Sequence, residues 1–188
     1  MRWVTASGVR HFSLHIAPNL GKRATPVSWV RTFGRKVTIM IIGIPRESLP
    51  GENRVAATPT TVPALLKLGY EVVVEAGAGE HAAQPDRAYE EAGARIVEPG
   101  EAWKADLVLA VNEPTDDQIS LMRAGAVLVT FLHPRQDLAL TEKLAAAGVT
   151  GLSMDMVPRI SRAQSMDALS SMANISGYRA VVEAAFAY

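Results

Sequence analysis

Residues 38–75 read TIMIIGIPRESLPGENRVAATPTTVPALLKLGYEVVVE, and this stretch predicts the fold. Its first seven residues, TIMIIGI, form a continuous apolar run that is typical of a strand buried on both faces. Residues 59–68 predict a helix, with Thr58 as its N-cap and Gly69 at its end. Residues 71–75, EVVVE, are β-branched and predict a second strand. Two strands joined by a helix indicate a right-handed crossover within a parallel sheet.

The same alternation of short apolar runs and amphipathic stretches continues along the chain. It predicts strands at residues 95–97, 107–111, 126–132 and 149–154, and helices at residues 85–92, 116–122 and 137–147. Strands separated by helices of about ten residues are typical of an α/β protein with a mostly parallel sheet flanked by helices. We therefore expect a Rossmann-like or flavodoxin-like lobe over residues 40–164.

Residues 165–188 have a different pattern. They contain no proline and one glycine, and they predict a long helix that starts near Ser165. This helix would reach the end of the chain without a cap, which suggests that the natural polypeptide continues beyond it.

The charges of the chain are distributed unevenly. Residues 1–39 contain seven Lys or Arg and no acid, whereas the rest carries twelve basic and nineteen acidic residues, a net charge of −7. The first segment is expected to be a disordered basic leader, similar to a transit peptide, or the product of a start placed upstream of Met40. The acidic domain argues against nucleic-acid binding, because phosphate contacts need excess Lys or Arg.

Two further classes of feature are excluded by composition. The chain has no cysteine, so it can form neither a disulfide framework nor a cysteine metal site, and no metal site is expected. It also lacks a run of about eighteen apolar residues, so we expect no membrane span in this chain.

A glycine-rich stretch follows the strand predicted at residues 71–75. Gly77, Gly79 and Ala82 match G-x-G-x-x-A, and Glu98 lies about twenty residues later, where an acid that binds ribose is expected. The dinucleotide-binding mechanism requires a helix that begins at the second glycine, but Pro85 favours a later start. We therefore interpret the stretch as a turn.

Two segments resemble a known family. They are IGIPRESLPGENRVAATPTTVPALLKLGYEVVVEAGAG at residues 42–79 and PRISRAQSMDALSSMANISGYRAVVEAA at residues 158–185. Both resemble the amino-terminal domain shared by alanine dehydrogenases and pyridine nucleotide transhydrogenases. The second is more similar to the alpha subunit (domain I) of proton-translocating transhydrogenases, and the resemblance runs from about Met40 to the last residue.

This resemblance implies a two-lobed protein in which a second, Rossmann lobe follows the long helix and holds NAD(H). The implied activity is hydride transfer from NADH to NADP⁺, coupled to proton translocation. The implied partners are the beta subunit, with its NADP(H)-binding domain and membrane domain, and a second copy in a homodimer. The implied location is cytoplasmic, peripheral to the inner membrane. Because the sequence lacks the second lobe, we expect the chain alone to be inactive.

In the second segment, the resemblance implies that Arg159, Gln164, Asp167 and Ser170 contact the nicotinamide end of NAD(H). The residue types suit this role, because a carboxamide offers a donor and an acceptor that a glutamine side chain can match. Asp167 and Ser170 are three residues apart and would share a helix face. Arg159 could bind a ribose hydroxyl or a phosphate, or could pair with Asp167. Hydride exchange between two nicotinamides needs no general acid or base, so no catalytic residue is assigned. A purely structural interpretation makes Ser165 an N-cap and Asp167 a first-turn stabiliser.

Two alternatives stay open. An alanine dehydrogenase-like enzyme would use an Arg, a Lys and a His, and the matching positions hold Arg54, Ala110 and His133, so the amine is missing. A non-catalytic docking or dimerisation domain would use the apolar positions of the last helix, at Tyr178, Val181, Val182, Ala185 and Phe186.

Overall fold

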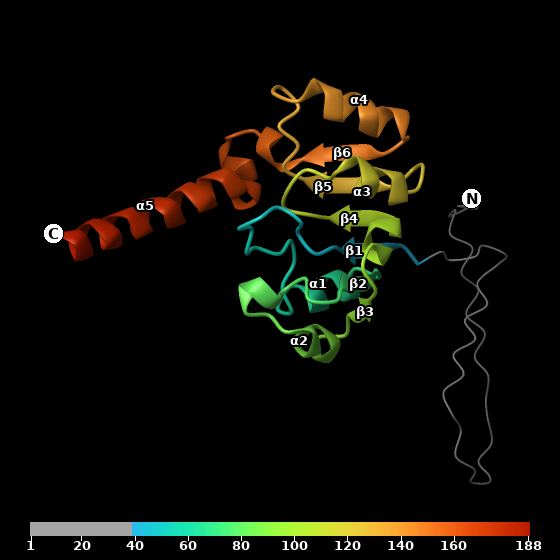
Figure 1. Cartoon of the computed structure of the whole chain (residues 1–188), viewed down its shortest axis with the longest axis horizontal. Coiled ribbons are helices and arrows are strands. Elements are labelled where there is room, and N and C mark those ends of the chain that lie inside the picture. Colours follow the sequence, from blue (N-terminus) through green and yellow to red (C-terminus); the bar gives the residue numbers. More distant parts are fainter. Residues whose placement is uncertain (1–38) are drawn as a thin grey trace, which may run out of the picture. The chain divides into compact units, whose positions relative to one another are not determined.

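A computed structural model describes residues 39–188 of the protein. Six strands form one sheet in the order β3-β2-β1-β4-β5-β6 (Figure 1), and every neighbouring pair is parallel. The strands are β1 (Ile41–Ile44), β2 (Glu71–Glu75), β3 (Arg95–Val97), β4 (Leu107–Leu109), β5 (Val127–Thr130) and β6 (Thr150–Ser153). This arrangement confirms the expected α/β class with a parallel sheet.

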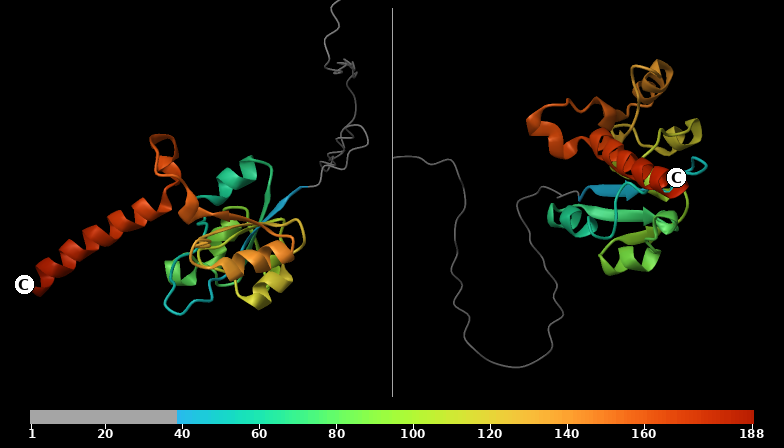
Figure 2. Two further views of the ribbon diagram at one scale, coloured as in Figure 1. Left: turned by 90° about the horizontal axis from the view of Figure 1, so that it is seen from above. Right: turned by 90° about the vertical axis from the view of Figure 1, so that its left-hand side faces the viewer.

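Helices lie on both faces of the sheet. The α-helices are α1 (Val62–Lys67), α2 (Asp86–Glu91), α3 (Asp116–Leu121), α4 (Leu138–Ala146) and α5 (Ala168–Ala187), with 3-10 turns η1 (Glu80–Ala82), η2 (Glu101–Lys104), η3 (Met154–Met156) and η4 (Ser161–Met166). The chain runs outward from β1 through β2 to β3, and outward on the other side from β4 through β5 to β6. Because crossovers are right-handed, these opposite directions place α1 on one face and α3 and α4 on the other (Figure 2).

Each face has its own apolar core. Val62 of α1 and Tyr89 of α2 pack with Ile42, Ile44 and neighbouring side chains of β1 and β2. On the other face, side chains of η2, α3 and α4 pack on β4 and β5; this cluster includes Trp103, Ile119, Leu140, Leu144, Val108 and Leu128. Gly43 of β1 allows η2 to approach closely, since a Cβ there would lie 2.0 Å from the carbonyl oxygen of Ala102.

The predicted elements are found with shifted ends. The predicted first helix begins later than expected, with Thr61 at its N-cap position, because the Thr58 carbonyl first accepts bonds from the amides of Thr61 and Val62. The prediction that the last helix starts near Ser165 was wrong by about one turn. Ser165 lies inside the 3-10 turn η4, and Asp167 caps α5.

The glycine-rich stretch forms a turn, as its sequence predicts. Gly77 has a φ of +72°, and its amide donates to the carboxylate of Asp86 at 2.9 and 3.1 Å. A Cβ at Gly79 would lie 2.4 Å from the carbonyl oxygen of Gln84. The next α-helix, α2, begins only at Asp86, after Pro85. The second glycine therefore provides room for packing and does not begin a phosphate-binding helix.

Helix α5 contains 20 residues, none of which is buried, and it extends beyond the sheet (Figures 1 and 2). Over residues 39–188, no helix combines the length and apolarity that crossing a bilayer would require. The predicted basic leader lies, apart from Ile39, outside the described residues.

Candidate functional site

The loops that leave the carboxyl ends of β1, β4 and β5 meet at the same edge of the sheet. β1 lies at the centre, and the chain order reverses between β1 and β4. In open α/β sheets, ligands bind outside the carboxyl ends of the strands at such a switch point. This edge is therefore where a site is expected on physical grounds.

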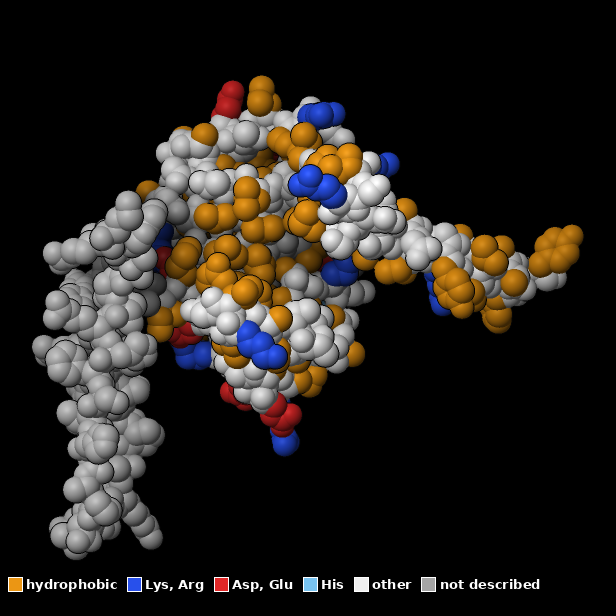
Figure 3. All heavy atoms as spheres, turned by 180° about the vertical axis from the view of Figure 1, so that it is seen from behind, with side chains coloured by type: hydrophobic (Ala, Val, Ile, Leu, Met, Phe, Trp, Pro, Cys, Tyr) orange, Lys and Arg blue, Asp and Glu red, His pale blue; other side chains and the backbone are white. Residues whose placement is uncertain are grey.

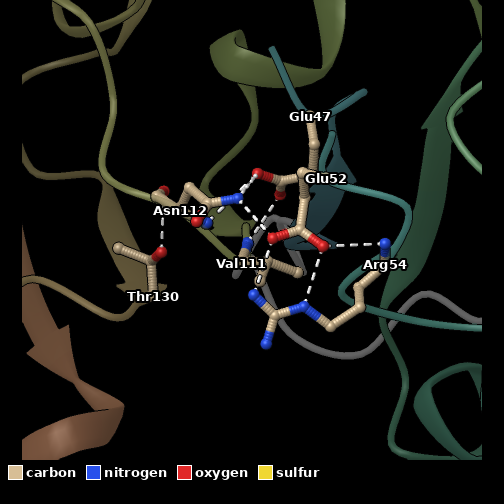
Figure 4. Close-up of polar contacts among 6 residues, drawn as sticks. All are labelled: Glu47, Glu52, Arg54, Val111, Asn112 and Thr130. Carbon is tan, nitrogen blue, oxygen red and sulfur yellow. Dashed lines mark hydrogen bonds and ion pairs between the residues drawn. The ribbon is translucent and has the colours of Figure 1, made fainter. Parts of the chain in front are cut away.

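Glu47 joins the loop after β1 to the loop after β4 (Figure 4). One of its carboxylate oxygens accepts from the amide of Val111 at 2.6 Å. The other accepts from the backbone and side-chain nitrogens of Asn112, at 3.1 and 2.9 Å. The hydroxyl of Thr130 donates to the Asn112 carbonyl at 2.9 Å, which ties in the end of β5. Three strand ends are thus held in one hydrogen-bonded unit.

Arg54 is held at this edge by Glu52. Its Nε and one terminal nitrogen donate to the two oxygens of the Glu52 carboxylate, at 2.8 and 2.6 Å, in a bidentate ion pair. The side-chain nitrogen of Asn112 also donates to Glu52, at 3.0 Å. Hydrogen bonds from Arg54, helped by Asn112, lower the pKa of Glu52 from 4.5 to about 2 despite its burial. Glu52 is therefore a carboxylate throughout the neutral range.

A cavity of about 460 Å³ opens beside this unit. Its walls come from the β1 loop, the ends of β4 and β5, the start of η3 and the first turns of α5. The lining residues are Arg54, Val55, Ala56, Leu109, Ala110, Val111, Val129, Phe131, Met154, Ala168 and Met172. Arg54 is the one charged residue among them, so the cavity suits an apolar, planar group with a polar substituent at its rim.

A second cavity of about 390 Å³ shares Phe131 with the first and is also lined by Asn112, Glu113 and His133. The Nδ1 of His133 lies 3.0 Å from a carboxylate oxygen of Glu113. His133 has a φ of +44°, a left-handed backbone conformation that residues other than glycine rarely adopt.

Asp155 stabilises this turn by accepting from the amides of Leu132 and His133, at 3.1 and 3.3 Å. Burial raises the pKa of Asp155, but hydrogen bonds from Ser153 and these amides outweigh it and lower the pKa. The left-handed turn at His133 is therefore held by an ionised side chain.

The four residues implied by the resemblance lie on η4 and at the start of α5. Arg159 and Gln164 are exposed, Asp167 is only 8% exposed, and Ser170 is exposed. None of the four lines the larger cavity, whereas Ala168 and Met172, close by on α5, do.

Asp167 and Ser170 contact each other, as their spacing predicts. Asp167 accepts from the Ser170 amide at 3.0 Å and from the Ser170 hydroxyl at 2.5 Å, so it is the N-cap of α5. These bonds lower its pKa, and the charge of Arg159 lowers it further. Among the ion pairs of the described residues, however, Arg159 does not pair directly with Asp167.

The positions considered for an alanine dehydrogenase lie in different surroundings. Arg54 and Ala110 both line the larger cavity, and His133 lines the smaller one. Ala110 is 9% exposed and belongs to the apolar core. No ammonium group lines either of these two cavities.

Sequence patterns did not single out Glu47, Glu52 or Asn112. The hydrogen bonds that connect Asn112 and Val111 with Glu47 and Glu52 span 60 to 65 residues of the chain. A usable signal existed, because Glu47 follows the predicted strand at residues 38–44 by three residues and Asn112 directly follows the one predicted at residues 107–111, at the carboxyl edge of a parallel sheet.

Within residues 39–188, no group of three or more His, Asp or Glu side chains is placed to hold a metal ion. The arrangement can enclose an apolar ring beside the guanidinium of Arg54, which is already paired with a carboxylate. The polar residues of η4 lie on the neighbouring surface. These are features of a binding and positioning site.

Three comparisons with known proteins bear on this site. The family described as "Alanine dehydrogenase/PNT, N-terminal domain" matches residues 43–176. The NAD(P) transhydrogenase subunit alpha of Haemophilus influenzae is 56% identical over 146 residues, which cover 78% of this chain and 28% of that subunit. The alanine dehydrogenase of Bacillus subtilis is 38% identical over 139 residues, which cover 73% of this chain and 36% of that enzyme.

The crystal structure of a transhydrogenase from Sinorhizobium meliloti superposes with a TM-score of 0.76 at 46% identity. The match covers 79% of this chain and 45% of that one. The chain thus spans less than half the length of each of these relatives, and the similarity extends through the sheet into η4 and the start of α5.

Proposed function

Since the chain belongs to the family of alanine dehydrogenase and PNT N-terminal domains, we propose that it forms the first α/β lobe of a proton-translocating NAD(P) transhydrogenase alpha subunit. In this role the lobe covers the nicotinamide end of NAD(H), which a second lobe holds. The observation that carries the proposal is the greater identity to the transhydrogenase subunit than to alanine dehydrogenase over the same domain.

The larger cavity supports this role through its chemistry. Its walls are apolar apart from Arg54, whose guanidinium is already neutralised by Glu52. An uncharged aromatic ring is favoured in such surroundings, whereas a 2-oxo acid would find no unpaired cation among the lining residues. The cavity therefore favours a nicotinamide ring over the substrate of an alanine dehydrogenase.

We assign Gln164 and Arg159 to the polar groups around that ring. Both side chains are exposed on the surface next to the start of α5. Gln164 offers a donor and an acceptor to the carboxamide, and Arg159 offers donors to ribose or phosphate oxygens. Asp167 holds the first turn of α5 through Ser170, and so it fixes where η4 meets the helix. NAD(H), when bound, supplies the hydride, and the chain contributes positioning and exclusion of water.

The proposed partners follow from the same role. They are a beta subunit with an NADP(H)-binding domain and a membrane domain, and the proposed location is the cytoplasmic side of the inner membrane. A homodimer of the alpha subunit belongs to this proposal as well. The chain alone is expected to transfer no hydride.

A chimaera tests the proposal. Residues 43–176 replace the matching segment of the Haemophilus influenzae subunit, and the assembled complex is assayed for oxidation of NADH by an acetylpyridine analogue of NADP⁺. We expect activity. Gln164→Ala should slow hydride transfer more than it weakens NADH binding, whereas Arg162→Ala, on the same turn, should change neither.

The competing function makes a different prediction. A second chimaera places residues 43–176 in the alanine dehydrogenase of Bacillus subtilis. If this chimaera reduces NAD⁺ with alanine while the transhydrogenase chimaera is inactive, the chain belongs to an amino acid dehydrogenase and our proposal is wrong. Equal rates for Gln164→Ala and its parent would remove Gln164 from the site while leaving the domain assignment intact.

A further inference from the structure

Arg54 is the charged member of a cavity wall that is otherwise apolar. Every other residue that lines the larger cavity is Ala, Val, Leu, Met or Phe. Leu109 of this wall packs against the apolar cluster beneath α1, and Val129 pairs with it in the neighbouring strand. Figure 3 views the face of the sheet on which α1 lies and shows hydrophobic side chains gathered across it. Because few polar groups are present to compensate a charge, the charge on Arg54 decides which ligands this wall accepts.

Glu52 cancels the charge of Arg54 from behind the wall. The side chain of Arg54 is 46% exposed, whereas that of Glu52 is 8% exposed and does not line the cavity. The carboxylate accepts from Nε and one terminal nitrogen of Arg54, at 2.8 and 2.6 Å. A guanidinium has five N–H groups, and this pair uses two of them, which leaves three for a ligand. Arg54 therefore keeps hydrogen-bond donors although its charge is neutralised.

Glu47 adds a second carboxylate to the same hydrogen-bonded unit. The side-chain nitrogen of Asn112 donates to Glu47 and to Glu52, at 2.9 and 3.0 Å (Figure 4). The unit thus contains two carboxylates against the one guanidinium of Arg54. An anionic ligand beside Arg54 would meet this excess of negative charge, whereas an uncharged ligand would not.

We propose that Glu52 determines the ligand selectivity of the larger cavity: it leaves Arg54 able to donate to an uncharged carbonyl group and prevents Arg54 from attracting a carboxylate. The inference rests on the proposed function and goes beyond it, because it states which dinucleotides the cavity accepts. A dinucleotide whose ring carries a carboxamide is bound. One whose ring carries a carboxylate, as in nicotinic acid adenine dinucleotide, is rejected. Glu52 acts through Arg54 and does not itself contact the ligand.

The size of the effect follows from what Glu52→Gln would change. The guanidinium of Arg54 would keep its charge and lose its carboxylate, so the carboxylate of a ligand could take that place. Hydrogen bonds to charged groups strengthen binding by about tenfold to a hundredfold. Because the Arg54 side chain is 46% exposed, water screens part of this attraction, and we expect an effect of about tenfold.

Binding of two dinucleotides tests the proposal. The probes are NADH and the reduced form of nicotinic acid adenine dinucleotide, which differ only in the carboxamide or carboxylate on a ring that is itself uncharged. Isothermal titration calorimetry gives both dissociation constants for the Haemophilus influenzae chimaera that carries residues 43–176. We expect the parent chimaera to bind NADH at least about tenfold more tightly than the carboxylate probe. Glu52→Gln should reduce this ratio by about tenfold, mainly through tighter binding of the carboxylate probe.

Three further variants separate the charge of Glu52 from its structural role. Glu52→Asp keeps the carboxylate and should keep the parent ratio. When Glu52→Gln is combined with Arg54→Gln, no cation remains for the carboxylate probe, so the parent ratio should return. Glu101→Gln removes a half-exposed carboxylate that pairs with Lys104 and does not line the cavity, so it should change neither dissociation constant. A purely structural loss at position 52 would weaken both ligands alike and leave the ratio unchanged.

Two results would overturn the inference and leave the proposed function intact. One is a parent chimaera that transfers hydride and binds the two dinucleotides with similar affinity. The other is a ratio for Glu52→Gln that equals the ratio for the parent. A parent chimaera that binds neither dinucleotide and transfers no hydride would reject the proposed function, and this inference with it.

Discussion

The carboxylate of Glu52 holds the guanidinium of Arg54 in a bidentate pair across a single intervening residue. The pair lies at the rim of the larger cavity, and the amide of Asn112 links it to Glu47 at the end of β1. A short-range ion pair is thus built into a network that joins three strand ends. Because the pair lies at the rim of the cavity, it affects which ligands the cavity can bind.

Removal of the Glu52 charge should lower the stability of the domain in a manner that depends on pH. The folded pKa of about 2 lies below the ordinary 4.5, so the stabilisation is fully present above pH 4.5 and is lost as the pH falls toward 2. Glu52→Gln should reduce the free energy of unfolding by about 1–2 kcal/mol at pH 7. Urea titrations at pH 7 and pH 3 should show a smaller difference at the lower pH.

The matched control is Glu101→Gln, which breaks the half-exposed pair between Glu101 and Lys104. Such surface pairs contribute little, so its effect should stay below about 0.5 kcal/mol at either pH. Equal losses for the two variants would mean that the network around Glu52 adds nothing to its pair with Arg54.

Asn112→Asp should destabilise the same network by a different route. The Asn112 amide donates to Glu47 and Glu52 at 2.9 and 3.0 Å, so the variant replaces a shared donor with a third carboxylate. We expect a loss of about 2 kcal/mol at pH 7, which shrinks as the pH falls below 4 and the repulsion is relieved. Asn174→Asp on the exposed surface of α5 should be neutral in the same thermal unfolding measurement.

Asp167→Ala should loosen the start of α5 with little change in global stability. Asp167 caps a helix in which no residue is buried, so about 1 kcal/mol of capping is lost locally. Hydrogen exchange should accelerate at Ser170 and Ser171. The counterpart is Asp137→Ala, which removes the cap of α4, where Leu140 and Leu144 are buried. Asp137→Ala should therefore lower the midpoint of global unfolding. A lower midpoint for Asp167→Ala, with an unchanged one for Asp137→Ala, would contradict this account.

Gly43→Ala should unfold or strongly destabilise the domain, by about 3 kcal/mol, because the added Cβ would meet the backbone oxygen of Ala102 at 2.0 Å. Gly177→Ala provides the contrast, since nothing lies within 4 Å of a Cβ there and alanine favours a helix. Circular dichroism melts should show a much lower unfolding midpoint for Gly43→Ala and an unchanged midpoint for Gly177→Ala, because no residue of α5 is buried. A folded, unshifted Gly43→Ala would show that η2 can move away from β1.

Much of the fold could be predicted from local patterns. The β-branched run of β2 and the short β3 have the predicted bounds, and the other strands begin or end within a few residues of their predicted limits. The helix ends were harder to predict, because hydrogen bonds outside the helix shift them. The 3-10 turn before α5 is one case: its sequence is compatible with a helix, but the chain turns at Asp167, which caps α5.

The site divides in a similar way. The contact between Asp167 and Ser170 follows from their spacing of three residues, whereas the roles of Arg159, Gln164, Asp167 and Ser170 at a nicotinamide stay a prediction. Residue spacing did not predict the hydrogen bonds among Glu47, Glu52 and Asn112, because these partners are 60 to 65 residues apart and meet only when parallel strands align. Only the placement of Glu47 and Asn112 just beyond two strands could have pointed to them.

The amino-acid order alone therefore determined the alternation of strands and helices, since apolar periodicity and turn residues act over a few neighbouring positions. Tertiary structure alone decided which strand ends meet and that Arg54, which lines the larger cavity, is already paired with Glu52. Those outcomes depend on strand order and register, which bring distant residues within hydrogen-bonding distance and which no local pattern encodes.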